Sequence, residues 1–277
     1  MIQHAVLITG CSSGIGLCLA NGLRDHGFRV IASARKQEDV AMLKSLGHEA
    51  VQLDLADSHS IRSAVETVLE LTGGKLYGLV NNGAYGQPGA VEDLRREVLR
   101  EQFETNLFGT QELTNLLLPV MREQGEGRII QISSVLGIVC LAYRGAYNAT
   151  KFALEALSDT MRLELRGSGV HISLVEPGPI VSKFRDNAYA MYKKNIVPDS
   201  SAHKARYLAM EQRLEGRAGR MPFTLPPEAC LEKTLHALKA KKPRIRYPVT
   251  FPTYLFHALR RLLPAFMLDW VAWKVSD

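Results

Sequence analysis

The sequence has few of the residues that build disulfide frameworks or metal sites. Its 277 residues include only four cysteines, and no two of them form a Cys-x-x-Cys pair. The eight histidines are scattered along the chain without a His-x-x-x-His pair. This spacing argues against a disulfide scaffold and against a bound metal, and it suits a reducing cytoplasm.

Features of exported, repetitive and multi-domain chains are missing as well. The first residues carry no charged leader before an apolar run, so no signal peptide is expected. No internal repeat, low-complexity tract or linker interrupts the chain, and 46% of its residues are apolar against 22% charged. These values are ordinary for a globular protein, and we expect one domain over residues 1–277.

The charge balance is basic, which raises the question of nucleic acid. The net charge is +6 and the isoelectric point is about 9.1. Outside the C-terminal region, the lysines and arginines form no stripe with interleaved aromatic residues, so no nucleic-acid partner is expected.

The chain does have a regular alternation of apolar runs and segments with helical spacing. Strands are predicted over 4–9, 28–33, 49–53, 77–81, 127–133, 170–175 and 244–247, and helices over 14–26, 38–46, 58–71, 93–122, 146–167 and 226–240. Several strands are apolar throughout, which is typical of parallel strands covered by helices on both faces. We therefore predict an α/β protein with a Rossmann-type, doubly wound parallel sheet of about seven strands.

Ligands of such sheets bind beyond the carboxyl ends of the strands. Six residues of potential function each follow a predicted strand: Gly10, Arg35, Asp54, Asn82, Ser134 and Pro177. The agreement of separate positions with one geometric rule indicates a single site at this edge.

The turn after the first strand reads Thr-Gly-Cys-Ser-Ser-Gly-Ile-Gly and leads into a predicted helix. A strand, a glycine-rich turn and a helix together place a pyrophosphate on a helix N-terminus. Gly10 would allow the tight turn, Gly14 would let phosphates approach the backbone, and Gly16 would let the helix pack close to the strand. The predicted cofactor-binding residues here are Gly10, Ser12, Ser13, Gly14, Ile15 and Gly16.

Tyr147 and Lys151 are four residues apart and therefore share one face of a predicted helix. An unperturbed phenol has a pKa of about 10, and a neighbouring ammonium favours its ionised form. The hydroxyl of Ser134 could hold a carbonyl oxygen while the phenol supplies a proton. These three side chains together fit carbonyl reduction or alcohol oxidation.

The motifs resemble those of the short-chain dehydrogenase/reductase superfamily in order and spacing, over residues 3–182. The matching segments are Thr-Gly-x-x-x-Gly-Ile-Gly, Asn81-Asn82-Gly83-Ala84, Asn106, Ser134, Tyr147 with Lys151, and Pro177-Gly178. The chain is most similar to bacterial NADP-dependent aldehyde and ketone reductases related to 17β-hydroxysteroid and retinol dehydrogenases. It departs from the family pattern at Gly83-Ala84, where Ala-Gly is usual, and at Ser182, where threonine is usual.

The resemblance implies a catalytic set of Asn106, Ser134, Tyr147 and Lys151. Tyr147 would donate a proton as hydride reaches the carbonyl carbon, while Lys151 would lower the pKa of the phenol and hold the nicotinamide ribose. Asn106 would support a water that returns the proton through Lys151, or it would only satisfy backbone groups of its own helix.

The resemblance also implies further cofactor contacts. Asp54 would recognise the adenine, although a carboxylate there equally fits the start of a helix. The remaining implied contacts are Leu55, Asn82, Gly83, Ala84, Tyr147, Lys151, Pro177, Gly178, Ile180 and Ser182.

The residues after the second strand bear on the choice of cofactor. An NAD site would place an acidic residue there to accept from the ribose hydroxyls, and none occurs before Glu38. Arg35 could instead bind a 2′-phosphate with its planar guanidinium group, so NADP(H) is predicted. The alternative is that Arg35 is simply a solvated basic residue.

Residues 183–222 correspond to the insertion that covers the substrate in this superfamily, and we expect a helical lid. Its aromatic residues and methionines would either line an apolar pocket or pack as ordinary helices. The expected substrate-binding residues are Ser134, Cys140, Tyr143, Tyr147 and Phe184. A hydrophobic carbonyl or alcohol substrate is expected.

The C-terminal region is unusual in composition. Residues 241–277 carry seven Lys or Arg against two Asp, together with both tryptophans of the chain. Charged residues and a proline interrupt the apolar ones, so no spanning helix is predicted. An amphipathic extension over 251–277 fits a membrane-surface contact, a cap on the substrate pocket or a subunit interface.

Three functions would share this site. The first is an NADPH-dependent reductase of apolar aldehydes or ketones, such as aliphatic aldehydes or retinal-like and steroid-like compounds. The others are an NAD(P)-dependent dehydrogenase that oxidises a hydrophobic alcohol, and a non-catalytic NADP-sensing protein. The intact proton donor favours an enzyme. The resemblance implies a cytoplasmic homodimer or homotetramer that pairs through the helices holding Asn106 and Tyr147.

Overall fold

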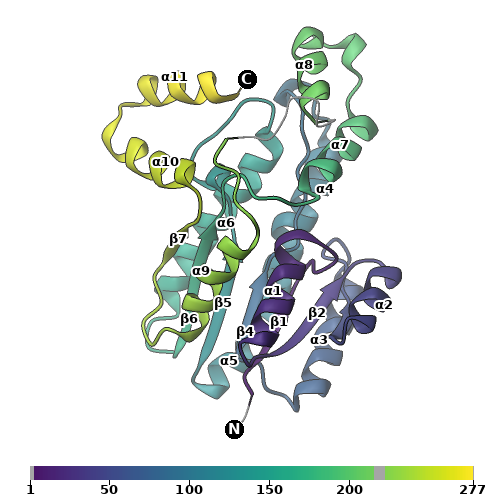
Figure 1. Ribbon diagram of the computed structural model, residues 1–277, viewed down its shortest axis with the longest axis vertical. Helices are drawn as coiled ribbons and strands as arrows, with labels where there is room; N and C mark the ends of the chain where they lie inside the picture. The colour runs from purple at the N-terminus through teal and green to yellow at the C-terminus, as the bar shows by residue number, and fades with distance from the viewer. Residues whose placement is uncertain (1–2, 215–221, 277) are drawn as a thin grey trace.

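The structure is a computed structural model and describes residues 3–214 and 222–276. Its strands are β1 (Ala5–Ile8), β2 (Arg29–Ala34), β3 (Glu49–Gln52), β4 (Gly78–Asn81), β5 (Gly127–Ile132), β6 (Val170–Glu176) and β7 (Arg246–Pro248). They form one parallel sheet in the order β3-β2-β1-β4-β5-β6-β7 (Figure 1). After β3 the chain crosses back to β4, which pairs with β1 on the side away from β2, as in doubly wound folds. The predicted fold class is confirmed.

Helices connect the successive strands. They are α1 (Gly14–Asp25), α2 (Gln37–Ser45), α3 (Ser58–Thr72), α4 (Arg96–Phe103), α5 (Gly109–Gln124), α6 (Gly145–Glu164) and α9 (Glu228–Lys239). The single helix predicted over 93–122 is wrong, because the structure divides it into α4, the π-helical turn η2 (Glu104–Phe108) and α5. A π turn widens the hydrogen-bonded loop by one residue, and such turns are frequent at functional sites.

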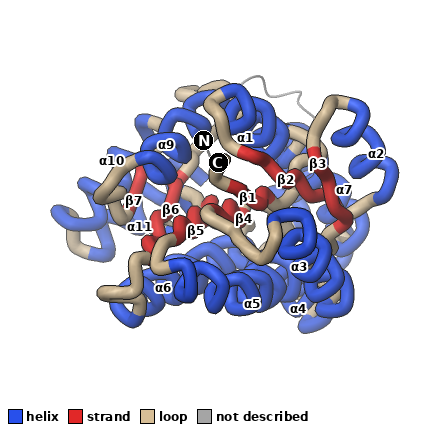
Figure 2. Tube along the Cα trace, turned by 90° about the horizontal axis from the view of Figure 1, so that it is seen from below, coloured by secondary structure: helices blue, strands red, loops and turns tan. Residues whose placement is uncertain are grey.

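Helices lie on both sides of the sheet (Figure 2), and the alternation of side chains along each strand divides the core into two clusters. In β1, Val6 and Ile8 belong to one buried cluster with residues of α1, α2 and α9. Ala5 and Leu7 belong to a second cluster with residues of α3, α5 and α6. A period of two residues sends successive side chains to opposite faces. Burial of both sets explains why the strand is apolar throughout.

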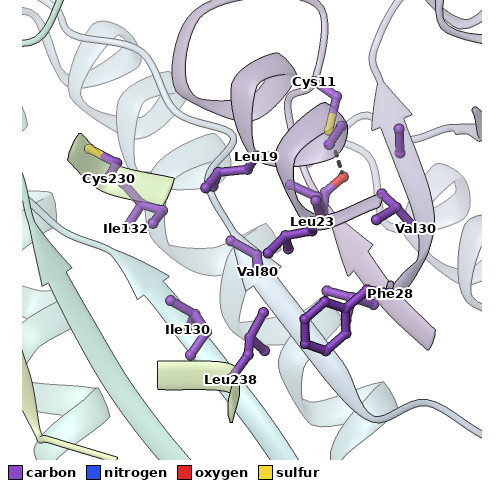
Figure 3. Close-up of a cluster of buried hydrophobic side chains, with 14 of the residues drawn as sticks. Cys11, Leu19, Leu23, Phe28, Val30, Val80, Ile130, Ile132, Cys230 and Leu238 are labelled. Atoms are coloured by element: carbon purple, nitrogen blue, oxygen red, sulfur yellow. Dashed lines mark hydrogen bonds between the residues drawn. The ribbon is translucent and has the colours of Figure 1, made fainter. Parts of the chain in front are cut away.

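The first of these clusters contains two of the four free cysteines (Figure 3). The thiol of Cys11 lies 3.3 Å from the carbonyl oxygen of Ile8, where it donates a hydrogen bond. Burial raises the pKa of both the Cys11 and the Cys230 thiol to about 12. These thiols therefore act as small core side chains rather than as nucleophiles.

Local signals set several helix ends. The Asp57 side chain caps α3 by accepting a hydrogen bond from the N–H of His59 at 2.9 Å. Gly73 ends the same helix at φ 63°, and Gly125 ends α5 at φ 70°. Residues with a side chain rarely adopt this left-handed conformation, which is why glycine stands at both ends.

Between β6 and β7 the chain forms α7 (Phe184–Asn195), the 3-10 turn η4 (Pro198–Ser200) and α8 (Lys204–Leu214) before α9. These elements occupy the segment expected as a lid over 183–222, of which residues 215–221 lie outside the described part. Tyr192 and Tyr207 are fully buried. They pack in one cluster with Ala90 and Leu94, which flank the 3-10 turn η1 (Val91–Asp93) after β4. The Tyr207 hydroxyl accepts a hydrogen bond from the N–H of Ala90 at 2.9 Å. Most of the aromatic lid residues therefore pack as ordinary core.

After β7 the chain forms α10 (Phe251–Leu262) and α11 (Ala265–Ser276), drawn in yellow at the upper left of Figure 1. Pro264 lies between the two helices. Within residues 3–214 and 222–276, none of the helices has the length and apolar character needed to cross a bilayer.

Gly109, the first residue of α5, allows a test of how tightly the helices pack against the rest of the protein. A Cβ at Gly109 would lie 1.7 Å from the carbonyl oxygen of Leu55. We expect Gly109→Ala to destabilise the protein by about 2–3 kcal/mol through overpacking. The control Gly73→Ala, whose Cβ would meet nothing within 4 Å, should cost about 1 kcal/mol from its left-handed backbone. Urea unfolding of both variants measures the difference, and equal losses would show that the helix shifts to make room.

Candidate active site

A cavity of about 950 Å³ lies at the carboxyl edge of the sheet. The chain segments that follow β1, β4, β5 and β6 all contribute to its wall. The predicted site residues in its lining are Gly10, Ser12, Ser13, Gly14, Ile15, Gly16, Asn82, Gly83, Ala84, Ser134, Tyr143, Tyr147, Lys151, Pro177, Gly178, Ile180, Ser182 and Phe184. Arg35, Asp54, Leu55, Asn106 and Cys140 are not among the residues that line it.

The glycine-rich turn has the backbone geometry that a bound pyrophosphate needs. Gly10 and Gly14 have φ of 70° and 56°, and a Cβ at Gly16 would lie 2.1 Å from the carbonyl oxygen of Gly10. The N-cap residue Ser13 makes no side-chain capping bond, and the first turn of α1 holds no acidic residue. The N–H groups of this helix end therefore face the cavity with their positive dipole unneutralised. The residues present fit a dinucleotide phosphate group.

Asn82 connects the ends of β1 and β4. Its side-chain amide donates to the carbonyl oxygens of Thr9 at 2.9 Å and Gly10 at 3.1 Å. The Thr9 hydroxyl in turn accepts from the N–H groups of Asn82 and Gly83. A Cβ at Gly83 would meet Leu55 at 3.1 Å, so the swapped Gly83-Ala84 order leaves the tightest position to glycine.

Tyr147 and Ser134 lie together in the cavity wall, and both are about 9% exposed. Burial raises the pKa of the Tyr147 phenol, and a hydrogen bond with the Ser134 side chain opposes this rise. The expectation that Lys151 lowers this pKa is not met here, because desolvation of the phenolate is the dominant effect. The phenol is therefore protonated at neutral pH, and the raised pKa makes it a weaker acid than a phenol in water.

Lys151 is buried one helical turn from Tyr147, and its Nζ atom lies 5.6 Å from the centroid of the phenol ring. The ammonium group donates to the carbonyl oxygen of Ile132 at 2.7 Å. Burial lowers the pKa of Lys151 to about 8, while the charge of Glu155 acts in the opposite direction. The pairing predicted from the four-residue spacing is therefore present in space.

Asn106 lies in the π turn η2 and is almost completely buried. Its side chain accepts from the N–H of Tyr85 at 3.1 Å and donates to the carbonyl oxygen of Tyr85 at 2.8 Å. A longer contact of 3.4 Å joins it to the Thr150 hydroxyl. Its amide thus positions the chain after β4 against α6. The Tyr85 backbone groups lie in a loop, so these contacts differ from the helix contacts expected as the simpler role of Asn106.

Three predicted adenosine-side residues lie near the ends of β2 and β3. Arg35 is exposed directly after β2. Asp54 accepts a hydrogen bond from the N–H of Ala56 at 3.0 Å, so its carboxylate is already part of a turn. Leu55 is buried with its carbonyl oxygen against Gly109.

The segment after β6 passes over the glycine-rich turn. A Cβ at Gly14 would lie 2.9 Å from the Cβ of Ser182, so these two segments are in close contact. A Cβ at Gly178 would lie 2.0 Å from the Thr250 hydroxyl at the start of α10. The loop that would face a nicotinamide is therefore held by both the first helix and the C-terminal region.

The far wall of the cavity is mostly apolar. The Phe184 ring packs edge-on against the Tyr147 ring at 5.3 Å between centroids, and Tyr143 and Met210 also line the wall. Cys140, expected to bind substrate, does not line this cavity; it borders a separate hollow of about 380 Å³. The reason is that the chain turns outward after η3 (Val135–Gly137) and leaves Cys140 exposed.

Sequence reasoning missed a buried polar cluster behind Lys151. Glu155 and Glu176 are buried carboxylates, and both lie within ion-pair distance of Arg246, at 2.9 and 3.3 Å. His257 of α10 contacts the other oxygen of Glu176 at 2.5 Å. Burial and the charge of Glu176 raise the pKa of Glu155. The one signal in the sequence was that Glu155 follows Lys151 by four residues.

Comparison with known proteins assigns the chain to a family. Residues 4–193 match the family model described as short chain dehydrogenase. The chain is 43% identical over 269 residues to the uncharacterized oxidoreductase YbbO of Escherichia coli, covering 97% of this chain and 94% of YbbO. It therefore belongs to the short-chain dehydrogenase/reductase family. Its members bind a nicotinamide cofactor and act on CH–OH or C=O groups of small substrates, and this chain is an oxidoreductase of that type.

Two further relatives are similar to this chain along most of its length. The NADPH-dependent 3-dehydrocapnine reductase of Ornithobacterium rhinotracheale is 33% identical, with 99% of this chain and 97% of the relative covered. Retinol dehydrogenase 16 of Mus musculus is 32% identical, with 95% and 86% covered. A crystal structure of a short-chain dehydrogenase from Streptomyces avermitilis is 29% identical and superposes with a TM-score of 0.77, covering 100% of this chain and 98% of that one.

The buried ammonium of Lys151 makes stability depend on pH. Its pKa of about 8 lies below the value of about 10.4 expected for an unfolded lysine, so between these values the unfolded chain binds more protons. The contribution of Lys151 to stability should therefore rise with pH in that window, by about 3 kcal/mol. The free energy of unfolding of Lys151→Met, measured relative to the wild type, should fall by this amount across the window.

Urea unfolding at a series of pH values tests this expectation. The control Lys36→Met removes an exposed lysine and should run parallel to the wild type. A Lys151→Met curve that also runs parallel would mean that Lys151 is not a buried cation.

Proposed function

We propose that the protein is an NADPH-dependent reductase of apolar aldehydes or ketones. The observation that carries this proposal is the position of the Tyr147 phenol beside the Ser134 hydroxyl, one helical turn from Lys151, in the wall of a largely apolar cavity. A phenol placed there can protonate the alkoxide that develops as a carbonyl group is reduced.

The residues of the chain divide the chemistry among them. The substrate carbonyl oxygen accepts hydrogen bonds from Ser134 and Tyr147, and Tyr147 delivers the proton through its Oη atom. Lys151, anchored on the Ile132 carbonyl oxygen with its Nζ atom 5.6 Å from the centroid of the phenol ring, holds the nicotinamide ribose. The bound cofactor supplies hydride. Asn106 supports this arrangement from the π turn, and a water that returns the proton through Lys151 stays a prediction.

The cofactor surface is proposed to recognise NADP(H). The glycine-rich turn and the loop from Pro177 to Ser182 would hold the pyrophosphate and nicotinamide ends. Arg35 is exposed at the end of β2, where it can reach a 2′-phosphate. The NADPH dependence of the 3-dehydrocapnine reductase supports the same choice.

The substrate is proposed to be an apolar carbonyl compound, such as an aliphatic aldehyde, a retinal-like polyene or a steroid-like ketone. Support comes from the apolar side chains that line the cavity with Tyr147, among them Phe184, Met210 and Phe256. The same residues would catalyse oxidation of the matching alcohol, and the cellular cofactor ratio would set the direction.

The protein is proposed to work as a cytoplasmic homodimer or homotetramer. Exposed apolar side chains on the helices that hold Asn106 and Tyr147 support assembly there, namely Phe108, Leu157 and Leu163. Burial of such a surface between subunits would be favourable.

The activity is tested by NADPH oxidation at an absorbance wavelength of 340 nm, with a panel of aliphatic aldehydes, retinal and steroid ketones. Tyr147→Phe should retain cofactor binding and lose about 10²- to 10⁴-fold in kcat, because only the proton donor is removed. Turnover that survives in Tyr147→Phe would contradict the assignment of the proton donor. Tight NADPH binding without turnover on any compound would favour a sensor.

Arg35 and its neighbour Lys36 offer a matched test of cofactor choice. Arg35→Ala should raise KM for NADPH about tenfold or more and leave KM for NADH nearly unchanged, because only NADPH carries the 2′-phosphate. Lys36, an exposed lysine paired with Glu38 at 3.0 Å, provides the control Lys36→Ala. Equal effects of Arg35→Ala on both cofactors would mean that Arg35 does not read the phosphate.

A further inference from the structure

The C-terminal helix α11 is apolar on two opposite faces. Its inner face packs on the enzyme: Ala272 is buried in a cluster with Ile138, Val139 and Phe256. The last turn is anchored as well, since the Ser276 hydroxyl accepts a hydrogen bond from the N–H of Ala142 at 3.0 Å. The position of the helix is therefore set by contacts that leave its other face outward.

The outer face carries large aromatic side chains. Phe266, Trp270 and Trp273 follow helical spacing and are 73%, 63% and 53% exposed. The neighbouring helix α10 adds Tyr254 at 50% and Leu262 at 78% exposed. We call these five residues the outer apolar face. Single exposed apolar residues are ordinary, but five large ones on two consecutive helices indicate a contact with another molecule or a membrane.

Most of the charges beside the outer apolar face are basic, which favours an anionic surface. Arg260 and Arg261 are exposed at the end of α10, and Lys274 follows Trp273 with its ammonium 5.1 Å from that ring. Asp269 is the single acidic residue of α10 and α11. Tryptophans beside lysine and arginine are typical of helices that lie in the interface of a bilayer. A second copy docked here by two-fold symmetry would instead bring like charges together.

The same helices connect this surface to the active site. Phe251, Leu255 and Val275 line the cavity and are also 57%, 40% and 48% exposed. Phe223, whose ring centroid lies 5.0 Å from that of Phe251, also lines the cavity and is 57% exposed. The apolar wall of the cavity is thus continuous with exposed apolar side chains next to the outer apolar face.

The geometry points to a monotopic membrane contact: α10 and α11 lie on an anionic bilayer through the outer apolar face, and the mouth of the cavity opens at the lipid surface. An apolar carbonyl substrate dissolved in the bilayer then reaches Tyr147 without crossing water. The delivery of substrate rests on the proposed reductase function, whereas the binding itself does not.

Both tryptophans of the chain lie on α11, so their fluorescence reports directly on this surface. The full-length protein is mixed with vesicles of equal parts phosphatidylglycerol and phosphatidylcholine, and with vesicles of phosphatidylcholine alone. We expect cosedimentation with the anionic vesicles, a blue shift of the emission and protection from acrylamide quenching. The absence of all three changes would overturn the proposal.

Two pairs of variants separate the contributions. Arg260→Gln/Arg261→Gln should weaken binding to anionic vesicles about tenfold or more. The control Arg95→Gln/Arg96→Gln removes the same charge from an exposed pair at the start of α4 and should not weaken it. Phe266→Ser should weaken binding. The control Leu46→Ser, which removes an exposed leucine elsewhere on the surface, should not. Equal losses within either pair would mean non-specific attraction and would overturn the proposal.

Two further measurements keep the alternatives apart. If a second copy covers the outer apolar face, light scattering without lipid would show that Phe266→Ser changes the subunit number, and this result would overturn the proposal. Turnover of a short, water-soluble aldehyde should be unchanged in Phe266→Ser, while turnover of a vesicle-dissolved aldehyde should fall. Loss of both activities in Tyr147→Phe, with vesicle binding intact, keeps the test of the reductase function separate.

Discussion

The whole site depends on the close approach of three backbone segments at the end of β1. A Cβ at Gly16 would overlap the carbonyl oxygen of Gly10, and a Cβ at Gly10 would lie 2.8 Å from the Cα of Gly83. Asn82 fills the remaining space by donating to the carbonyl oxygens of Thr9 and Gly10. This contact sets the N-terminus of α1 beside the ends of the neighbouring strands. Without it, the phosphate-facing helix end and the nicotinamide-facing loop would not border one cavity.

The second constraint is the burial of charge beside the proton donor. Removing the ammonium of Lys151 from water lowers its pKa, while the same burial raises the pKa of Tyr147, so the enclosed state favours a protonated phenol. The carboxylate of Glu155 opposes the loss of charge on Lys151 and is itself held by Arg246. Burial of these charges lowers the stability of the fold, because each buried charge requires a partner in the next layer of side chains.

That next layer joins the active site to the C-terminal helices. Glu176 ends β6 directly before Pro177, and its carboxylate contacts both Arg246 of β7 and His257 of α10. Thr250, at the start of α10, occupies the space that Gly178 leaves free. The C-terminal helices therefore pack on the nicotinamide-facing loop as well as lining the cavity. The proposed lipid contact would therefore place substrate entry close to this loop.

The sequence alone determined the parallel strands, the glycine-rich turn and the four-residue spacing of Tyr147 and Lys151, because these depend on local periodicity and on steric limits at single residues. The tertiary structure decided what local patterns do not encode. It divided the predicted helix over 93–122 at Asn106, turned Cys140 away from the cavity and buried most lid aromatics in their own core. It also gathered Glu155, Glu176, Arg246 and His257, which are far apart in the chain, into one polar cluster. Contacts between distant segments depend on packing and desolvation in the folded protein, and these arise only once the sheet has brought the segments together.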